Sequence, residues 1–148
     1  MIRAARFDEA DALVSAYDWL FAPPGAQPPQ WDGEAAVGRL RETIASGASE
    51  VLVADPGGDL PVVGICTVYL DLNSVRYGQR AWVEDLAVDP ERRSGGVGKQ
   101  LLDAAKDWAR SRGATHLELD SGEAREAAHR FYEREQPSWR SICFGWEL

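Results

Sequence analysis

A glycine-rich stretch at residues 93–98 carries the most specific chemical signal in the sequence. Arg93, Gly96 and Gly98 form an Arg-x-x-Gly-x-Gly pattern between the expected end of a strand and the expected start of a helix. Glycine lets the backbone approach a ligand closely, and the first N–H groups of a helix, together with its dipole, attract anions. The pattern predicts a pyrophosphate site, and the alternative is a tight turn that binds nothing.

Two common nucleotide-binding motifs do not fit this stretch. A Walker loop needs glycine five residues before its Gly-Lys pair and serine or threonine after it, but Arg93 and Gln100 occupy those positions. The dinucleotide fingerprint needs glycine three residues after its second glycine, where this chain has Leu101. A different class of phosphate-containing ligand is therefore expected.

A carboxylate precedes the glycines, in the strand expected over 80–88. Strand alternation predicts one face that is apolar apart from Glu84, formed by Trp82, Glu84, Leu86 and Val88. Asp85 falls on the opposite face and is expected to be a structural or substrate-side residue. An acid among apolar side chains has a raised pKa and can accept a proton near neutral pH. The alternative is a half-exposed glutamate at a strand edge.

Residues 88–98 resemble the signature of the GNAT superfamily of N-acetyltransferases, Gln/Arg-x-x-Gly-x-Gly/Ala after a strand that ends in a Val-x-Pro-like turn. A second family block is similar to Arg125–Tyr132, where Ala128 and Tyr132 match an Asn-x-x-Ala-x-x-x-Tyr pattern and Arg125 replaces the Asn. The Gly-Phe that usually follows the tyrosine is replaced by residues 136–139, so the final strand is expected to enter differently.

The resemblance implies a three-layer fold, with a mostly antiparallel central sheet, one parallel βαβ pair and helices on both faces. It also implies acetyl-CoA as co-substrate, with the pyrophosphate in the glycine loop and the pantetheine arm along the preceding strand. The implied cofactor-binding residues are Leu86, Ala87, Val88, Arg93, Ser94, Gly95, Gly96, Val97, Gly98, Lys99 and Arg125.

The same resemblance assigns the catalytic roles. An alkyl amine with a pKa of about 10.4 must lose a proton before it attacks a thioester. Residues 82–86 are similar to the Leu-Glu-Asp segment of spermidine/spermine acetyltransferases, which makes Glu84 the expected base. Tyr132 is the expected acid for the departing thiolate, with packing in the core as the alternative. Backbone N–H groups near Leu86 are expected to stabilise the developing oxyanion.

Other side chains with chemical potential carry weaker signals. His116 and His129 have no partners at metal-ligand spacing, and Cys66 and Cys143 lie in apolar runs, so no metal is expected. Trp31, just past a proline-rich loop over 22–30, is a candidate for the lining of a substrate pocket.

The elements that must position these residues follow from periodicity and turn chemistry. We expect strands at 2–7, 50–55, 61–70, 80–88, 114–121 and 141–148, and helices at 12–20, 36–44, from 94 onward and at 123–135. The strands at 50–55 and 61–70 form a hairpin, and 80–121 has the order of a right-handed βαβ crossover. The pattern is that of a mixed α/β sheet domain.

Composition limits the class of protein and its partners. The 148 residues, with 45% hydrophobic and 27% charged, predict one globular domain over 1–148. A net charge of −8 works against nucleic-acid or anionic-membrane binding, and no export or membrane segment is apparent, which predicts a cytoplasmic location. A small-molecule amine is the expected partner, and a homodimer through the segment SICFGWEL is plausible.

Two alternatives to a small-molecule acetyltransferase stay open at this point. The replaced Asn and the absent Gly-Phe also fit an acyl-CoA-binding sensor without turnover. Acetylation of protein N-termini or lysines would need an open groove in place of a closed pocket, and the sequence does not distinguish these possibilities.

Overall fold

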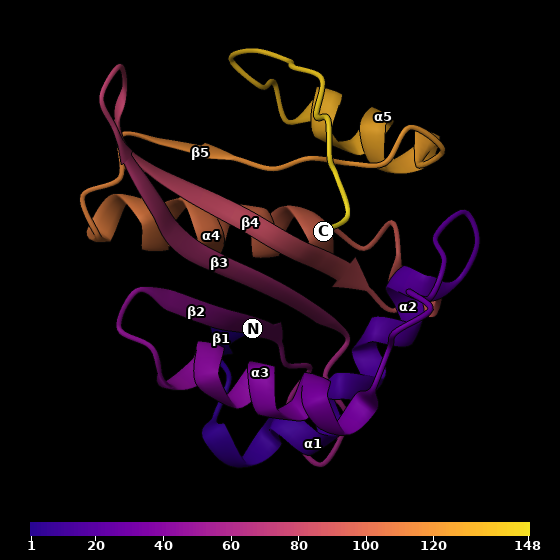
Figure 1. Cartoon of the computed structure of the whole chain (residues 1–148). Coiled ribbons are helices and arrows are strands. Elements are labelled where there is room, and N and C mark those ends of the chain that lie inside the picture. The colour runs from indigo at the N-terminus through magenta and orange to yellow at the C-terminus, as the bar shows by residue number, and fades with distance from the viewer.

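The central feature of the computed structural model, which describes all residues 1–148, is a five-stranded mixed sheet (Figure 1). The strands follow the chain in the order β1-β2-β3-β4-β5. They are β1 (Ile2–Ala4), β2 (Ser49–Ala54), β3 (Gly64–Ser74), β4 (Gly78–Val88) and β5 (His116–Glu118). The first three junctions are antiparallel and β4 pairs with β5 in parallel, so the predicted sheet is confirmed.

Helices cover both faces of the sheet, as predicted. One face carries α1 (Ala10–Leu13), α2 (Asp18–Phe21) and α3 (Gly33–Ala45), and the other carries α4 (Val97–Ser111). The split follows the alternation along β2, because Val51 and Val53 pack in the first core and Leu52 and Ala54 in the second. Helix α5 (Glu126–Arg134) lies beside β5 (Figure 1).

The helix predicted over 12–20 is a series of short pieces. Two 3₁₀ turns, Phe7–Glu9 and Val14–Tyr17, precede and follow α1, and α2 then completes the series. Helix α3 begins directly after Asp32, whose side chain caps it. The Asp32 carboxylate accepts hydrogen bonds from the backbone N–H groups of Glu34 at 3.0 Å and Ala35 at 3.3 Å.

A β-bulge in β4 overturns the predicted division of its two faces. Thr67 of β3 pairs with Asp85 and the next residue, Val68, pairs with Val83, so Glu84 is an extra residue without a partner. A bulge resets the alternation of side chains. Consequently Asp85 lies on the same face as Glu84, and Glu84 is not the only acidic residue there.

The predicted last strand, 141–148, is wrong, and the strand predicted over 114–121 is reduced to three residues. Residues 135–148 have no regular secondary structure, and Ile142, Phe144 and Trp146 are exposed. Gln136 has a φ of 54° and Pro137 has no N–H, so the backbone turns directly after α5 and does not pair as a strand. Trp139 instead donates a hydrogen bond from Nε1 to Glu118 Oε1 at 3.2 Å.

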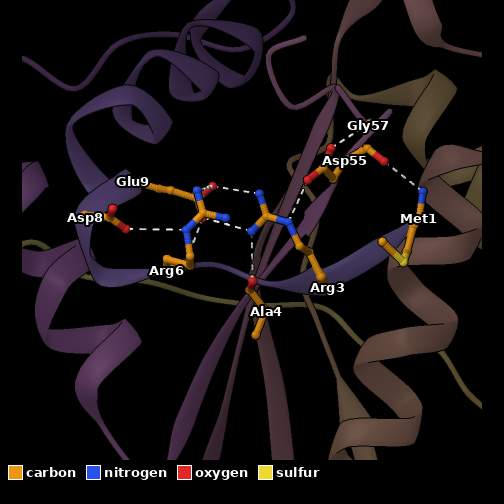
Figure 2. A network of polar contacts seen from close by, with 8 residues as sticks. All are labelled: Met1, Arg3, Ala4, Arg6, Asp8, Glu9, Asp55 and Gly57. Carbon is orange, nitrogen blue, oxygen red and sulfur yellow. Dashed lines mark hydrogen bonds and ion pairs between the residues drawn. The ribbon is translucent and has the colours of Figure 1, made fainter. Parts of the chain in front are cut away.

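An ionic network fastens β1 to the start of the helical region and to the end of β2 (Figure 2). Arg3 holds the Glu9 carboxylate through two nitrogens, at 2.6 and 2.9 Å, and donates from Nε to Asp55 Oδ2 at 2.7 Å. Arg6 adds a contact from Nη2 to Glu9 Oε1 at 3.0 Å. The Arg3 hydrogen bonds lower the pKa of Glu9 to about 2.

We expect Glu9→Gln to lower the free energy of unfolding by about 1–2 kcal/mol at pH 7, because charge-assisted hydrogen bonds to Arg3 are lost. A carboxyl whose pKa is depressed on folding stabilises the protein above its unfolded pKa and loses that effect as the pH falls toward the folded value. The difference between wild type and variant should therefore shrink from about pH 4.5 toward pH 2. Urea unfolding across this range measures it, with the exposed Glu42→Gln as control. A pH-independent difference would contradict the assignment.

Candidate active site

The glycine loop opens α4 in the conformation that an anion site needs. Gly96, the residue before the helix, has a φ of 80°, and Ser94 has a φ of 72°, so the backbone reverses sharply and exposes successive N–H groups. The first N–H groups of α4 have no acceptor within the helix. Arg93 donates from Nε to the Val88 carbonyl at 3.3 Å, which fixes the loop against the end of β4.

The two parallel strands separate beside this loop. Pairing between β4 and β5 ends at Trp82 and Glu118, and the two strands diverge beyond that point (Figure 1). The N–H of Asp89 bonds the Val63 carbonyl and that of Asp85 bonds Thr67 Oγ1, both at 3.0 Å and both toward β3. By alternation, the backbone groups of Leu86 and Val88 face the opened edge, whereas those of Ala87 face β3. This edge and the exposed loop fit an extended arm that ends in phosphates.

Two of the predicted cofactor-binding cations already have protein partners. Lys99 is ion-paired with Asp103 at 2.8 Å and with Glu135 at 3.3 Å, which links α4 to the end of α5. Arg125 donates from Nη2 to the Leu20 carbonyl at 2.9 Å and so holds the end of α2. Their contact with a cofactor stays a prediction.

A pocket of about 340 Å³ lies at the bulge, on the face of the sheet opposite to α4. It is formed between α3, the strands β3 and β4, and two aromatic side chains that precede α3. Its lining residues are Tyr17, Trp31, Ala36, Arg39, Leu40, Thr43, Thr67, Val68, Tyr69, Glu84 and Asp85. Trp31, predicted as a pocket residue, is among them.

Aromatic rings form one wall of this pocket. The ring centroids of Trp31 and Tyr17 are 5.7 Å apart, and those of Trp31 and Phe21 are 4.7 Å apart in an edge-to-face arrangement. Such pairs are held in place by their quadrupoles as well as by burial. The wall therefore presents a rigid apolar surface next to the two carboxylates.

Asp85 is fixed by hydrogen bonds from two other elements. Its Oδ2 accepts from Tyr17 Oη at 2.8 Å and from Thr67 Oγ1 at 3.1 Å. Burial and the Asp85 charge raise the pKa of Tyr17 well above its ordinary value, so Tyr17 stays protonated and donates. Sequence reasoning missed this trio. Tyr17 was indistinguishable from a core residue of its helix, and no signal in the sequence joined it to Asp85.

Glu84 is exposed to solvent at the pocket and points its carboxylate toward the neighbouring indole. Its Oε2 accepts a hydrogen bond from Trp82 Nε1 at 3.0 Å. Partial desolvation, followed by the negative charge of Asp85, raises the pKa of Glu84. The pKa of Glu84 is thus raised, as expected from the sequence. The cause differs in part, because the neighbouring Asp85 carboxylate contributes as well as the apolar surroundings.

Tyr132 is half-buried on α5, the helix that lies against the glycine loop. A Cβ at Gly98 would be 3.6 Å from the ring of Phe131, whose centroid is 5.1 Å from that of Tyr132. Burial raises the pKa of Tyr132 to about 12, so the phenol is protonated throughout the physiological range. A protonated phenol can donate a proton but cannot act as a base at neutral pH.

The mixed sheet with helices on both faces and the glycine loop before α4 fit an N-acetyltransferase. Residues 13–136 match the sequence profile of the "Acetyltransferase (GNAT) family", and the chain therefore belongs to this family. The predicted family and enzyme class are confirmed. The family uses acetyl-CoA. No helix combines the length and apolar composition that crossing a membrane requires, and no group of three or more His, Cys, Asp or Glu side chains is placed to hold a metal ion.

Curated relatives agree with the family. The chain is 48% identical over 59 residues to the uncharacterized N-acetyltransferase YhdJ of Bacillus subtilis (strain 168), a match that covers 40% of this chain and 42% of that protein. It is 31% identical over 103 residues to YhfO of the same organism, covering 70% and 68%. The aminoalkylphosphonate N-acetyltransferase of Salmonella typhimurium is 35% identical over 74 residues, covering 50% and 48%. The chain thus spans less than half the length of two of these relatives.

Solved structures share the fold at low sequence identity. Aminoglycoside N-acetyltransferase AAC(6')-Iy in complex with CoA superposes with a TM-score of 0.83 at 15% identity, covering 100% of this chain and 93% of that one. An aminoglycoside acetyltransferase from a soil metagenome, in complex with trehalose, gives 0.78 at 20% identity, covering 100% and 95%.

Proposed function

We propose that this enzyme transfers acetyl from acetyl-CoA to the primary amine of a small molecule by direct attack within a ternary complex. The observation that carries the proposal is that one strand, β4, serves both sites. Glu84 lies at the acidic pocket, and the opened edge at Leu86 and Val88 leads into the glycine loop. We also infer that residues 1–148 form a single acetyltransferase domain, because both helical layers pack on the same sheet.

The cofactor residues divide into two groups with different tasks. The N–H groups at the start of α4, from Gly96 to Lys99, are suited to the pyrophosphate, and Arg93 steadies their loop. The backbone groups of Leu86 and Val88 are suited to the amides of the pantetheine arm. Acetyl-CoA supplies the activated acetyl group as a thioester when it is bound.

Glu84 is the proposed base. A bound amine is mostly cationic at neutral pH and attacks only after it loses a proton. The raised pKa of Glu84 brings this carboxyl closer to the operating pH, and its solvent exposure allows transfer directly or through a water. Asp85, held by Tyr17 and Thr67, adds negative charge that attracts the ammonium form and raises the pKa of Glu84.

Tyr132 is the proposed acid for the departing thiolate. Its pKa of about 12 exceeds that of a free thiol, about 8.5, but burial raises the pKa of a thiol in the same surroundings as well. The proton therefore moves from Tyr132 as negative charge develops on sulfur. The acetyl group passes directly to the amine, so no side chain is acylated.

The relatives support a small acceptor. One is an aminoalkylphosphonate N-acetyltransferase and two structural neighbours are aminoglycoside acetyltransferases, all of which act on small amines by name. The limited volume of the pocket favours the same class over a protein segment.

Thiol release from acetyl-CoA in the presence of a panel of primary amines tests the proposal, with mass spectrometry of the products. We expect thiol release that requires both substrates and an acetylated amine in equal amount. Tight CoA binding without amine-dependent thiol release would contradict it and would support the alternative of an acyl-CoA-binding module.

A further inference from the structure

Arg39 gives the pocket a charge opposite in sign to that of Glu84 and Asp85. It lies on α3 and is the one Lys or Arg among the lining residues. Its exposed guanidinium makes no ion pair or hydrogen bond within the chain. Arg41, two residues further along α3, is by contrast paired with Asp11. The pocket therefore has two carboxylates on its β4 side and an uncommitted cation on its α3 side.

Such a pocket distinguishes amines by the charge on the rest of the molecule. The ammonium group is attracted to Glu84 and Asp85 whatever it is attached to. A second positive charge would approach the Arg39 guanidinium and be repelled, whereas a negative charge would be attracted to it. A neutral group would gain nothing from Arg39.

We propose that the acetyl acceptor is a small amine that also carries an anionic group, with its amino end at Glu84 and its anionic end at Arg39. This inference rests on the proposed function and adds the class of substrate. The pocket volume of about 340 Å³ lies near the lower end for ligand sites, so only a short connecting chain fits. The rings of Tyr17 and Trp31 offer the apolar wall for that chain.

Four short amines that differ in their second group test the charge preference. They are 4-aminobutanoate and 3-aminopropylphosphonate, whose second group is anionic, 4-aminobutanamide, whose second group is uncharged, and 1,4-diaminobutane, whose second group is cationic. We expect kcat/KM to be about tenfold higher for the two anionic probes than for the amide, and lowest for the diamine. Because Arg39 is exposed, this advantage should shrink as salt is added.

The variant Arg39→Gln tests whether Arg39 causes the preference for anionic amines. We expect it to raise KM for 4-aminobutanoate about tenfold, to leave kcat nearly unchanged and to have little effect on 4-aminobutanamide. Arg39→Lys should keep most of the preference, because it retains the charge. Arg110→Gln on α4, an exposed arginine outside the pocket, is the matched control, and unchanged CoA affinity shows that the variants are folded.

The outcomes distinguish a failure of the substrate-class inference from a failure of the proposed acetyltransferase function. A preference for the diamine or the amide, or equal losses for all probes in Arg39→Gln, would overturn the inference and leave the acetyltransferase proposal standing. Absence of thiol release with every amine would overturn the proposed function. In that case calorimetric binding of the same four probes to the CoA complex still measures the charge preference, and equal affinities would overturn it.

Discussion

Glu84→Gln should lower kcat by about 10²–10³-fold while changing KM for acetyl-CoA little. The amide keeps the size of the side chain and can still accept a hydrogen bond from Trp82, but it cannot take a proton from the amine. Single-turnover mixing of the enzyme and acetyl-CoA with the best amine of the panel measures the chemical step. A variant that retained wild-type turnover would remove Glu84 from the mechanism.

The pH dependence of kcat gives an independent check on the same residue. Glu84 accepts a proton only when ionised, so kcat should fall as the pH drops through its pKa, which is raised by desolvation and by Asp85. This acid limb should be absent in Glu84→Gln. It should move toward lower pH in Asp85→Asn, since the second cause of the raised pKa is then removed. The exposed Glu34→Gln on α3 serves as the control and should leave the profile unchanged.

Tyr132→Phe should lower kcat by about 10²-fold and leave the acid limb in place. The substitution removes only the hydroxyl, so the proton for the departing thiolate has to come from water. Because the pKa of Tyr132 is about 12, the wild-type enzyme should show no loss of activity from its ionisation below about pH 10.

The matched control for this substitution is Tyr77→Phe, which removes a hydroxyl from an exposed ring in the turn between β3 and β4. Both variants should unfold at nearly the wild-type urea concentration. If Tyr132→Phe and Tyr77→Phe were equally active in a single turnover, Tyr132 would be a packing residue of α5 and the thiolate would leave without its proton.

Much of the fold could be predicted because its signals are local. The apolar runs around Val51 and Ile65, the turn residues between them and the glycines before α4 each report on a few neighbouring residues. The last strand could not be predicted correctly, since alternate apolar residues at Ile142, Phe144 and Trp146 look the same whether or not a partner strand is present. The edge strand β5 offers only three paired residues.

The candidate site divides in the same way. The glycine loop and Glu84 could be singled out as candidates because their positions follow from short patterns. The face on which Asp85 lies could not be predicted. One unpaired residue in β4 moves the Asp85 side chain to the other face of the strand, and nothing in the composition signals this. Tyr17 lies 68 residues away from its partner Asp85 along the chain, and only the folded sheet brings the two together.

The bulge at Glu84 also separates the demands of folding from those of catalysis at this position. A residue without a partner on β3 contributes little to the ladder of the sheet, and an exposed side chain contributes little to the core. Substitutions at this position are therefore nearly free of a folding penalty, while Val83 and Ala87, buried close by, are constrained by packing. The position proposed to hold the base is thus constrained by its chemistry and not by packing, so substitutions there should impair turnover while leaving the free energy of unfolding nearly unchanged.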